Sequence, residues 1–143
     1  MNASLPRLAR HLGLAGLIPF LAGGIGVALG VSSLAFPLVA YGATILAFLG
    51  AVHWGLALRA PAAEAAALWP RLGLGVVPQL VGWVALLLPI GAGLALVAGG
   101  LLATAAVETL AARRGLLPWD YLRLRWLLSC GAAGCLIVAA AVR

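Results

Sequence analysis

The chain has 143 residues, which is enough for one domain, and 65% of them are hydrophobic while only 8% are charged. Soluble domains carry about 25% charged residues, so this chain has too few charges to cover the outside of a water-soluble globule. Together with a mean hydropathy of +1.18, the composition excludes a soluble enzyme or binding domain and indicates an integral membrane protein.

Five apolar segments follow one another, at about residues 8–30, 34–58, 68–88, 90–112 and 121–142. Each has close to the ~20 residues that a helix needs to cross the hydrocarbon core. An isolated strand cannot satisfy its backbone in lipid, so all five are predicted to be helices. The predicted fold is an all-α, polytopic membrane protein, a bundle of five transmembrane helices that forms one membrane domain over residues 1–143. Arg7 and Arg10 before an apolar run also fit a signal peptide, but the length of that run and the four spans after it favour a retained first span.

The net charge of +6 comes from nine arginines, because the chain has no lysine. A basic chain can bind nucleic acid, but here the basic residues lie in short gaps between apolar runs, a pattern typical of contact with anionic lipid headgroups. We therefore expect membrane lipids as partners and no nucleic acid.

The arginines alternate between the gaps, so that eight of them share one side of the membrane and only Arg143 lies on the other. The eight are Arg7, Arg10, Arg59, Arg71, Arg113, Arg114, Arg123 and Arg125. The positive-inside rule then predicts a cytoplasmic N-terminus and an external C-terminus. All of them except Arg125 are interpreted as topology or headgroup residues in a multi-pass protein of a cell inner membrane.

Two ionisable residues lie inside predicted spans, where such residues are costly and are candidates for function. His53 precedes Arg59 by six residues, about 9 Å of helix rise, and Glu108 precedes Arg113 by five, about 7.5 Å. Both side chains should lie at a similar depth and can pair if the second and fourth spans are neighbours. The pair would then serve as a proton relay or small-ligand site. Alternatively, Glu108 pairs with a nearby arginine and His53 bonds a backbone carbonyl.

Four further residues are candidates for a ligand or proton site. Gln79 lies mid-span beside Pro78 and is expected either to donate to a ligand or to bridge two helices. Tyr121 and Arg125 are four residues apart and therefore share a helix face. Trp54 lies near the arginine side, where an interfacial aromatic belt is expected.

No dense histidine and carboxylate motif, serine elbow or phosphate-binding glycine loop is present. We accordingly predict no catalytic residue, no metal and no cofactor. No gap between spans is long enough to fold as a soluble domain, so any activity must lie within the bilayer or at its rim.

Small residues four apart predict closely packed helix faces. The pairs are Gly26 with Gly30, Ala51 with Gly55, and Ala95 with Gly99. Pro19 and Pro78 lie inside spans and are expected to kink them, because each removes a backbone hydrogen bond.

Three stretches together resemble a known family. They are Tyr41-Gly42 with Gly50-Ala51-Val52-His53-Trp54-Gly55, Val77-Pro78 with Trp83, and Leu117-Pro118-Trp119-Asp120-Tyr121-Leu122-Arg123-Leu124-Arg125. The chain resembles the domain of unknown function 3429 family of small bacterial and mitochondrial membrane proteins, from about residue 12 to residue 136. One departure is Asp120, which separates a tryptophan and a tyrosine that are adjacent in the family. The resemblance implies five membrane helices and no established activity.

Three functions remain open. The first is a non-enzymatic accessory or assembly subunit of a larger membrane complex or homo-oligomer, or a binder of a lipophilic ligand. The second is a small transporter or proton-linked carrier that uses His53 and Glu108, with Gln79 on the pathway and Pro78 as a gate. The third is an intramembrane enzyme on a lipid or quinone headgroup, with His53 as base and Arg125 as anion clamp.

Overall fold

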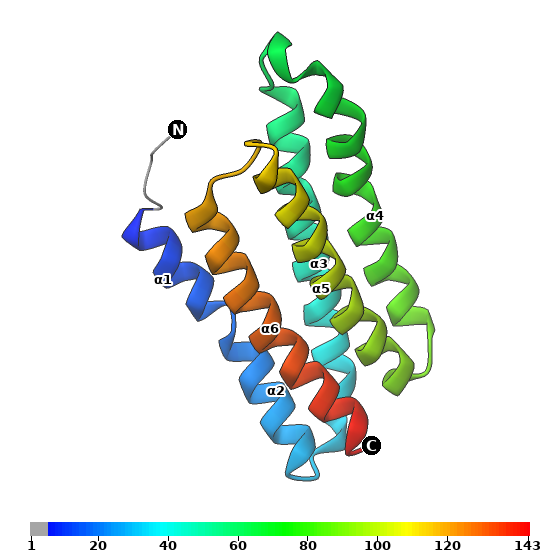
Figure 1. The fold of residues 1–143 in the computed structure, drawn as a ribbon. Helices are drawn as coiled ribbons and strands as arrows, with labels where there is room; N and C mark the ends of the chain where they lie inside the picture. Colours follow the sequence, from blue (N-terminus) through cyan, green and yellow to red (C-terminus); the bar gives the residue numbers. More distant parts are fainter. Residues whose placement is uncertain (1–5) are drawn as a thin grey trace.

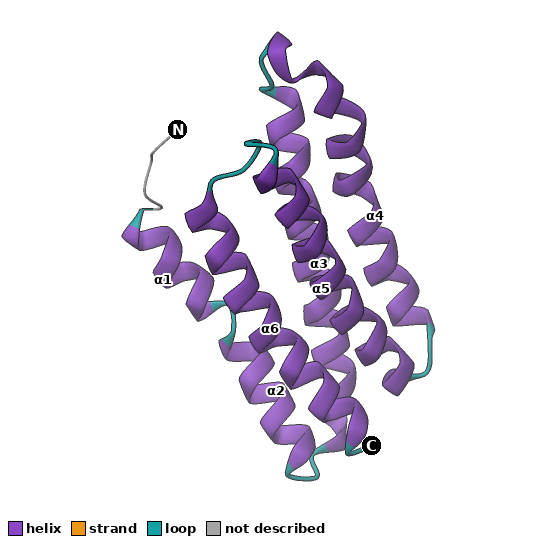
Figure 2. Ribbon diagram, viewed as in Figure 1, coloured by secondary structure: helices purple, strands orange, loops and turns teal. Residues whose placement is uncertain are grey.

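The computed structural model describes residues 6–143, and this part of the chain folds into helices joined by short loops (Figures 1 and 2). The elements in chain order are α1 (Arg7–Ala15), α2 (Ile18–Ala28), the 3-10 turn η1 (Ser32–Leu34), α3 (Ala35–Leu58), the 3-10 segment η2 (Ala62–Ala67), α4 (Leu68–Leu87), α5 (Ile90–Arg113) and α6 (Trp119–Ala141).

Five helical stretches are long and apolar enough to cross a membrane, which confirms the predicted all-helical fold with five spans. They cover Arg7–Ala28, Ser32–Leu58, Ala62–Leu87, Ile90–Arg113 and Trp119–Ala141. The bounds differ from the prediction by a few residues, mainly because η2 extends the third span toward its N-terminus.

The first span is broken into α1 and α2 by a turn at Gly16 and Leu17. Pro19 is the second residue of α2 and has no N–H to donate to the preceding turn, so the kink expected at Pro19 occurs as a break just before it. The Tyr41 hydroxyl donates to the Gly16 carbonyl at 2.8 Å and ties the break to α3. At Pro78, by contrast, α4 continues without a break.

The helices pack mainly as neighbours in the chain, with α3 against α4, α4 against α5, and α5 against α6. The bundle is closed by contacts of α3 with α5 and of α2 with both α3 and α6, as Figure 1 shows. Leu46, Leu94, Leu101 and Leu136 are fully buried at the centre. The predicted neighbourhood of the second and fourth spans, on which the His53–Glu108 pair depends, is thus present as α3 against α5.

Glycines lie where backbones approach most closely, but not at the predicted pairs. A Cβ on Gly50 of α3 would collide with the Gly75 carbonyl of α4, and a Cβ on Gly75 would overlap the Trp54 ring. Gly30 instead lies in a turn with φ of 96°. The other two predicted pairs are on exposed faces: a Cβ on Gly55 or Gly99 would meet nothing within 4 Å. Spacing alone does not say which face of a helix meets its neighbour, and that is why these pairs were wrong.

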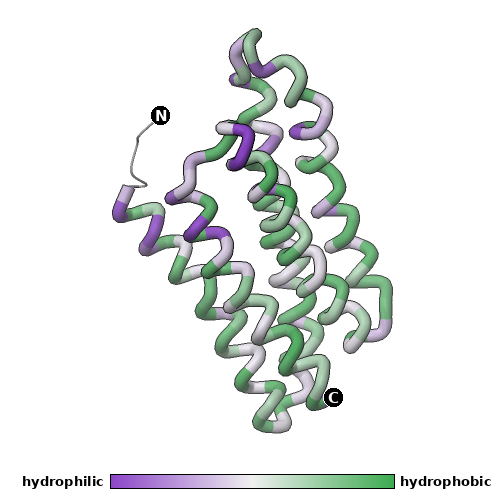
Figure 3. The backbone as a smooth tube through the Cα atoms, in the orientation of Figure 1, coloured by the Kyte–Doolittle hydropathy of each residue, from purple (hydrophilic) through white to green (hydrophobic). Residues whose placement is uncertain are grey.

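Hydrophilic residues gather at the end of the bundle where α1 and α6 begin and α3 and α5 end, which we call the arginine end (Figure 3). The opposite end, where α6 finishes, is largely apolar. Since α1 begins at one end and α6 finishes at the other, the two ends of the described chain lie on opposite sides of the bundle (Figure 1).

Candidate functional site

Glu108 of α5 is the centre of a buried polar cluster. Its Oε1 lies 2.8 Å from Nε2 of His53 on α3, and its Oε2 accepts a hydrogen bond of 2.8 Å from Nε of Arg125 on α6. The exposed fractions are 0% for Glu108, 2% for His53 and 4% for Arg125, so none of the three reaches solvent appreciably. The two alternatives left open by the sequence, a histidine partner and an arginine partner, therefore occur together on the two oxygens of one carboxylate.

Helix α6 supplies the remaining polar groups from a single face. Tyr121, Arg125 and Ser129 follow one another at four-residue spacing, which stacks them on one face of the helix. Arg125 Nη1 donates to Ser129 Oγ at 3.1 Å, and the Tyr121 hydroxyl lies 3.5 Å from Glu108 Oε1. Ser129 was not a candidate from the sequence, although its spacing from Arg125 was a signal that could have found it.

The guanidinium of Arg125 keeps one free donor. Its Nη2 is the buried side-chain polar atom that has no hydrogen-bond partner among the described residues. A buried donor without a partner costs about 1–3 kcal/mol, and more when it is charged. Such a group needs an acceptor, and none of residues 6–143 provides one.

The cluster is close to electrically neutral when His53 is uncharged, because Glu108 carries one negative and Arg125 one positive charge. A buried pair of this kind is retained only with good geometry, since each ion loses its hydration. Here both carboxylate oxygens and two of the three guanidinium nitrogens have partners. Two of the segments that carry the family resemblance supply three members of the cluster: one provides His53, and another provides Tyr121 and Arg125.

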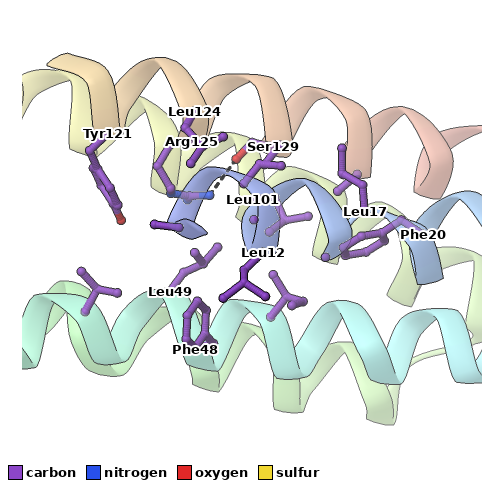
Figure 4. Close-up of a pocket in the computed structure, with 17 residues that line it drawn as sticks. Leu12, Leu17, Phe20, Phe48, Leu49, Leu101, Tyr121, Leu124, Arg125 and Ser129 are labelled. Atoms are coloured by element: carbon purple, nitrogen blue, oxygen red, sulfur yellow. Dashed lines mark hydrogen bonds between the residues drawn. The ribbon is translucent and has the colours of Figure 1, made fainter. Parts of the chain in front are cut away.

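An apolar pocket of about 460 Å³ adjoins the cluster, between α1 and α2 on one side and α3, α5 and α6 on the other (Figure 4). Arg125 and Ser129 face it from α6, and Phe48 and Leu49 lie across from them on α3 (Figure 4). Among the described residues that line this pocket, Tyr121, Arg125 and Ser129 are the ones with polar side chains. The apolar pocket therefore has a mostly hydrocarbon lining and one polar wall, and that wall includes Arg125, whose guanidinium keeps one nitrogen without a partner.

A second pocket of about 410 Å³ lies at the arginine end and borders the cluster through His53. Arg71 lines this arginine-end pocket, is only 7% exposed, and donates to Glu64 Oε2 at 2.7 Å. The sequence predicts a headgroup residue at Arg71, whereas the structure buries this side chain and pairs it with Glu64 of η2. Arg114 lines the same pocket. The buried cluster thus separates two pockets, and Glu108 lies between them.

The two remaining candidates lie elsewhere. Trp54 donates from Nε1 to the Leu72 carbonyl at 3.2 Å, which ties α3 to α4. Gln79 is exposed and shares a hollow of about 190 Å³ with Trp54 and Gly75. Its amide makes no hydrogen bond to any described residue, so it does not bridge two helices as expected. Neither side chain makes a hydrogen bond to the described residues of the buried cluster.

The arginines predicted to contact headgroups, Arg71 apart, are exposed and lie at or near the helix ends that form the arginine end. Among residues 6–143 there is no group of three or more histidine, cysteine, aspartate or glutamate side chains that could hold a metal ion. The polar cluster offers hydrogen-bond donors and one shared carboxylate, which suits it to hold a polar headgroup or to pass a proton.

Comparison with known proteins places the chain. Residues 5–141 match the family described as "Protein of unknown function (DUF3429)". The chain belongs to this family. It is also 44% identical over 87 residues to Transmembrane protein 69 of Xenopus tropicalis, in an alignment that covers 57% of this chain and 33% of that protein. The chain thus spans about a third of the length of that relative. No solved structure matches. The family expected from the three sequence stretches is confirmed, and its description gives no activity.

Proposed function

We propose that this protein is a non-enzymatic membrane protein that binds a lipophilic ligand in the apolar pocket. The observation that carries the proposal is the pocket itself, about 460 Å³ of apolar space that ends on the partly unpaired guanidinium of Arg125. Small-molecule sites have volumes of about 300–1,000 Å³ and mostly apolar linings with a few placed polar groups. The pocket has both properties.

The polar wall supports binding better than catalysis. Nucleophilic catalysis needs a nucleophile beside a base, with donors aimed at the developing oxyanion. Ser129 accepts from Arg125 instead of lying beside a base, and Glu108 is held by both His53 and Arg125. These residues form a fixed polar end for a ligand, and no described side chain completes a catalytic set with them.

Retention of the ligand through purification tests the proposal. The 143-residue chain would be purified in mild detergent and its bound lipids identified by mass spectrometry against a detergent blank. Ala9 lines the apolar pocket on α1, so Ala9→Trp places an indole in this pocket. Ala15, also exposed on α1, is not part of the lining, and Ala15→Trp is the matched control.

A lipophilic compound should accompany the wild type and Ala15→Trp at similar occupancy and be depleted in Ala9→Trp. Equal occupancy in the two tryptophan variants, or no compound above the blank in the wild type, would count against a ligand in this pocket.

We further propose that the protein lies in an inner membrane with the arginine end in the cytoplasm. The grouping of the arginines at one end supports this orientation, because cytoplasmic loops carry an excess of basic residues.

The second candidate function is a proton-linked carrier, and the position of the cluster between two pockets favours it. His53 borders the arginine-end pocket, while Arg125 and Tyr121 border the apolar pocket. A proton on His53 can pass to Glu108 through their 2.8 Å hydrogen bond. His53→Ala and Glu108→Gln should abolish proton-coupled flux in liposomes when both variants remain folded. Flux equal to that of the wild type in both folded variants would exclude this function.

A further inference from the structure

The unpaired atom of Arg125 specifies the headgroup of the ligand. Nε and Nη1 of the guanidinium donate to Glu108 and Ser129, which leaves Nη2 as a buried donor without a partner on a side chain that lines the apolar pocket. A donor in that position is satisfied by an oxygen acceptor on the occupant. A purely hydrocarbon occupant would leave it unsatisfied.

The charge of the cluster decides between a neutral and an anionic acceptor. The positive charge of Arg125 is already balanced by Glu108 at 2.8 Å. An anionic headgroup would add a second negative charge to a buried site with one arginine, and its desolvation would not be repaid. A neutral carbonyl oxygen accepts from Nη2 without changing the charge of the site.

We propose that the apolar pocket takes an amphiphile with a neutral carbonyl headgroup, of the type found in quinone rings and lipid esters, and that Arg125 Nη2 donates to that carbonyl oxygen. This inference rests on the proposed function and adds the chemistry of the headgroup. The Tyr121 hydroxyl lies on the same wall, and its hydrogen bond to Glu108 Oε1 is long, at 3.5 Å. It is therefore a second donor that can turn to the headgroup. The apolar remainder of the pocket receives the alkyl or isoprenoid chain.

Three probes with the same tail separate the possible headgroups. Decylbenzoquinone has neutral carbonyls, decylbenzene has no acceptor, and decyl sulfonate is an anion. Affinities would be measured in nanodiscs and expressed per mole fraction of probe in the bilayer, so that partitioning does not enter the comparison. Decylbenzoquinone should bind about tenfold more tightly than decylbenzene, because a hydrogen bond to a charged donor is gained. It should also bind more tightly than decyl sulfonate.

The variant Arg125→Lys keeps a positive charge for Glu108 but has no second nitrogen to reach the pocket. It should lose the preference for the quinone over decylbenzene, while decylbenzene binding stays unchanged. The matched control is Arg123→Lys, an exposed arginine on the same helix that does not line the pocket, and it should behave as the wild type does. If Arg125→Lys does not fold, the binding of the three probes to the wild type still tests whether the pocket prefers a neutral carbonyl headgroup.

Each other outcome overturns the inference. Equal binding of decylbenzene and decylbenzoquinone to the wild type would show that no acceptor is required. Tightest binding of decyl sulfonate would identify an anion site. A quinone preference that survives Arg125→Lys would place the donor elsewhere. In each case a ligand that is lost on Ala9→Trp would still support the proposed function, so the two proposals fail separately.

Discussion

At the scale of single residues, Glu108 is the acceptor that holds three helices together. It lies on α5 and accepts from His53 on α3 and from Arg125 on α6. Each partner alone would be a polar or charged group in an apolar bundle. Because removing one member of a buried ion pair leaves the other uncompensated, the cost of a substitution here should depend on what remains.

The double-mutant cycle of Glu108→Gln and Arg125→Gln tests this dependence. Each single variant should lose about 3–5 kcal/mol of stability, because one buried charge is left without its counter-charge. The double variant should lose less than the sum of the two, since both charges are gone. Thermal unfolding in detergent measures the stability of the wild type, the two single variants and the double variant. Additive losses would contradict a direct interaction between the two side chains.

The sequence predicts some members of this cluster and hides others. The sequence predicts the pair of His53 and Glu108, because ionisable residues are rare within spans and the positions of the spans give the depth of both side chains. The burial of Arg125 could not be predicted from the sequence, since an arginine close to the start of a span also suits the headgroup layer. It turns inward because α5 places Glu108 beside it. The four-residue spacing of Ser129 from Arg125 places both on one helix face, and this spacing points to Ser129 once Arg125 is known to be buried.

At the scale of elements, α3 and α4 are held at a distance that only glycine allows. A Cβ on Gly50 would meet the backbone of α4 at Gly75, and backbone cannot move aside as a flexible side chain can. The Trp54 indole covers Gly75 and bonds to the Leu72 carbonyl. Close approach of this kind is the main source of helix association in lipid.

The substitution Gly50→Ala should therefore destabilise the protein, by about 1–3 kcal/mol as is typical of overpacking. The control is Gly55→Ala, one turn along α3 in open space, where alanine should be neutral or stabilising by up to about 1 kcal/mol from its higher helix propensity. Unfolding temperatures of the two variants in the same detergent give the comparison. Equal temperatures would mean that the helices can move apart without cost.

The break between α1 and α2 is tied to α3 by a hydrogen bond from Tyr41. Its hydroxyl donates to the Gly16 carbonyl at 2.8 Å, at the point where the helical ladder of the first span is interrupted. Hydropathy shows one continuous span here and Pro19 suggests a kink, so the position of the break is not visible in the sequence. In the structure it falls at Gly16 and Leu17, just before Pro19, and the Gly16 carbonyl accepts from Tyr41 on α3.

Tyr41→Phe removes that donor and should cost about 1 kcal/mol, with faster amide hydrogen exchange over residues 7–15 as α1 loosens. Tyr121→Phe is a suitable comparison, because the Tyr121 hydroxyl lies 3.5 Å from Glu108 and its loss should leave exchange in α1 unchanged. Mass spectrometry of deuterated peptides resolves the two helices. Unchanged exchange of α1 in Tyr41→Phe would mean that other contacts hold the break.

At the scale of the whole molecule, the polar groups are concentrated in one half. The buried cluster and the arginine-end pocket lie toward the end where the exposed arginines gather, and the far half is almost wholly apolar (Figure 3). The sequence predicts this asymmetry, since it follows from the order of charged and uncharged gaps. Cavities are not predicted, because they depend on how side chains from several helices fit.

The orientation of this asymmetry can be measured with two cysteine variants in a background where Cys130 and Cys135 are replaced by alanine. Ser33→Cys lies in the turn between α2 and α3, and Ala62→Cys in η2 at the arginine end; both positions are exposed. If the arginines face the cytoplasm, a membrane-impermeant maleimide should label Ser33→Cys in intact spheroplasts and leave Ala62→Cys unlabelled. Inverted vesicles should give the reverse, and detergent-solubilised samples should label at both sites as a control for reactivity.

Labelling of Ala62→Cys alone in spheroplasts would place the arginine end outside. The positive-inside rule would then fail for this chain, and the arginine-end pocket would open away from the cytoplasm.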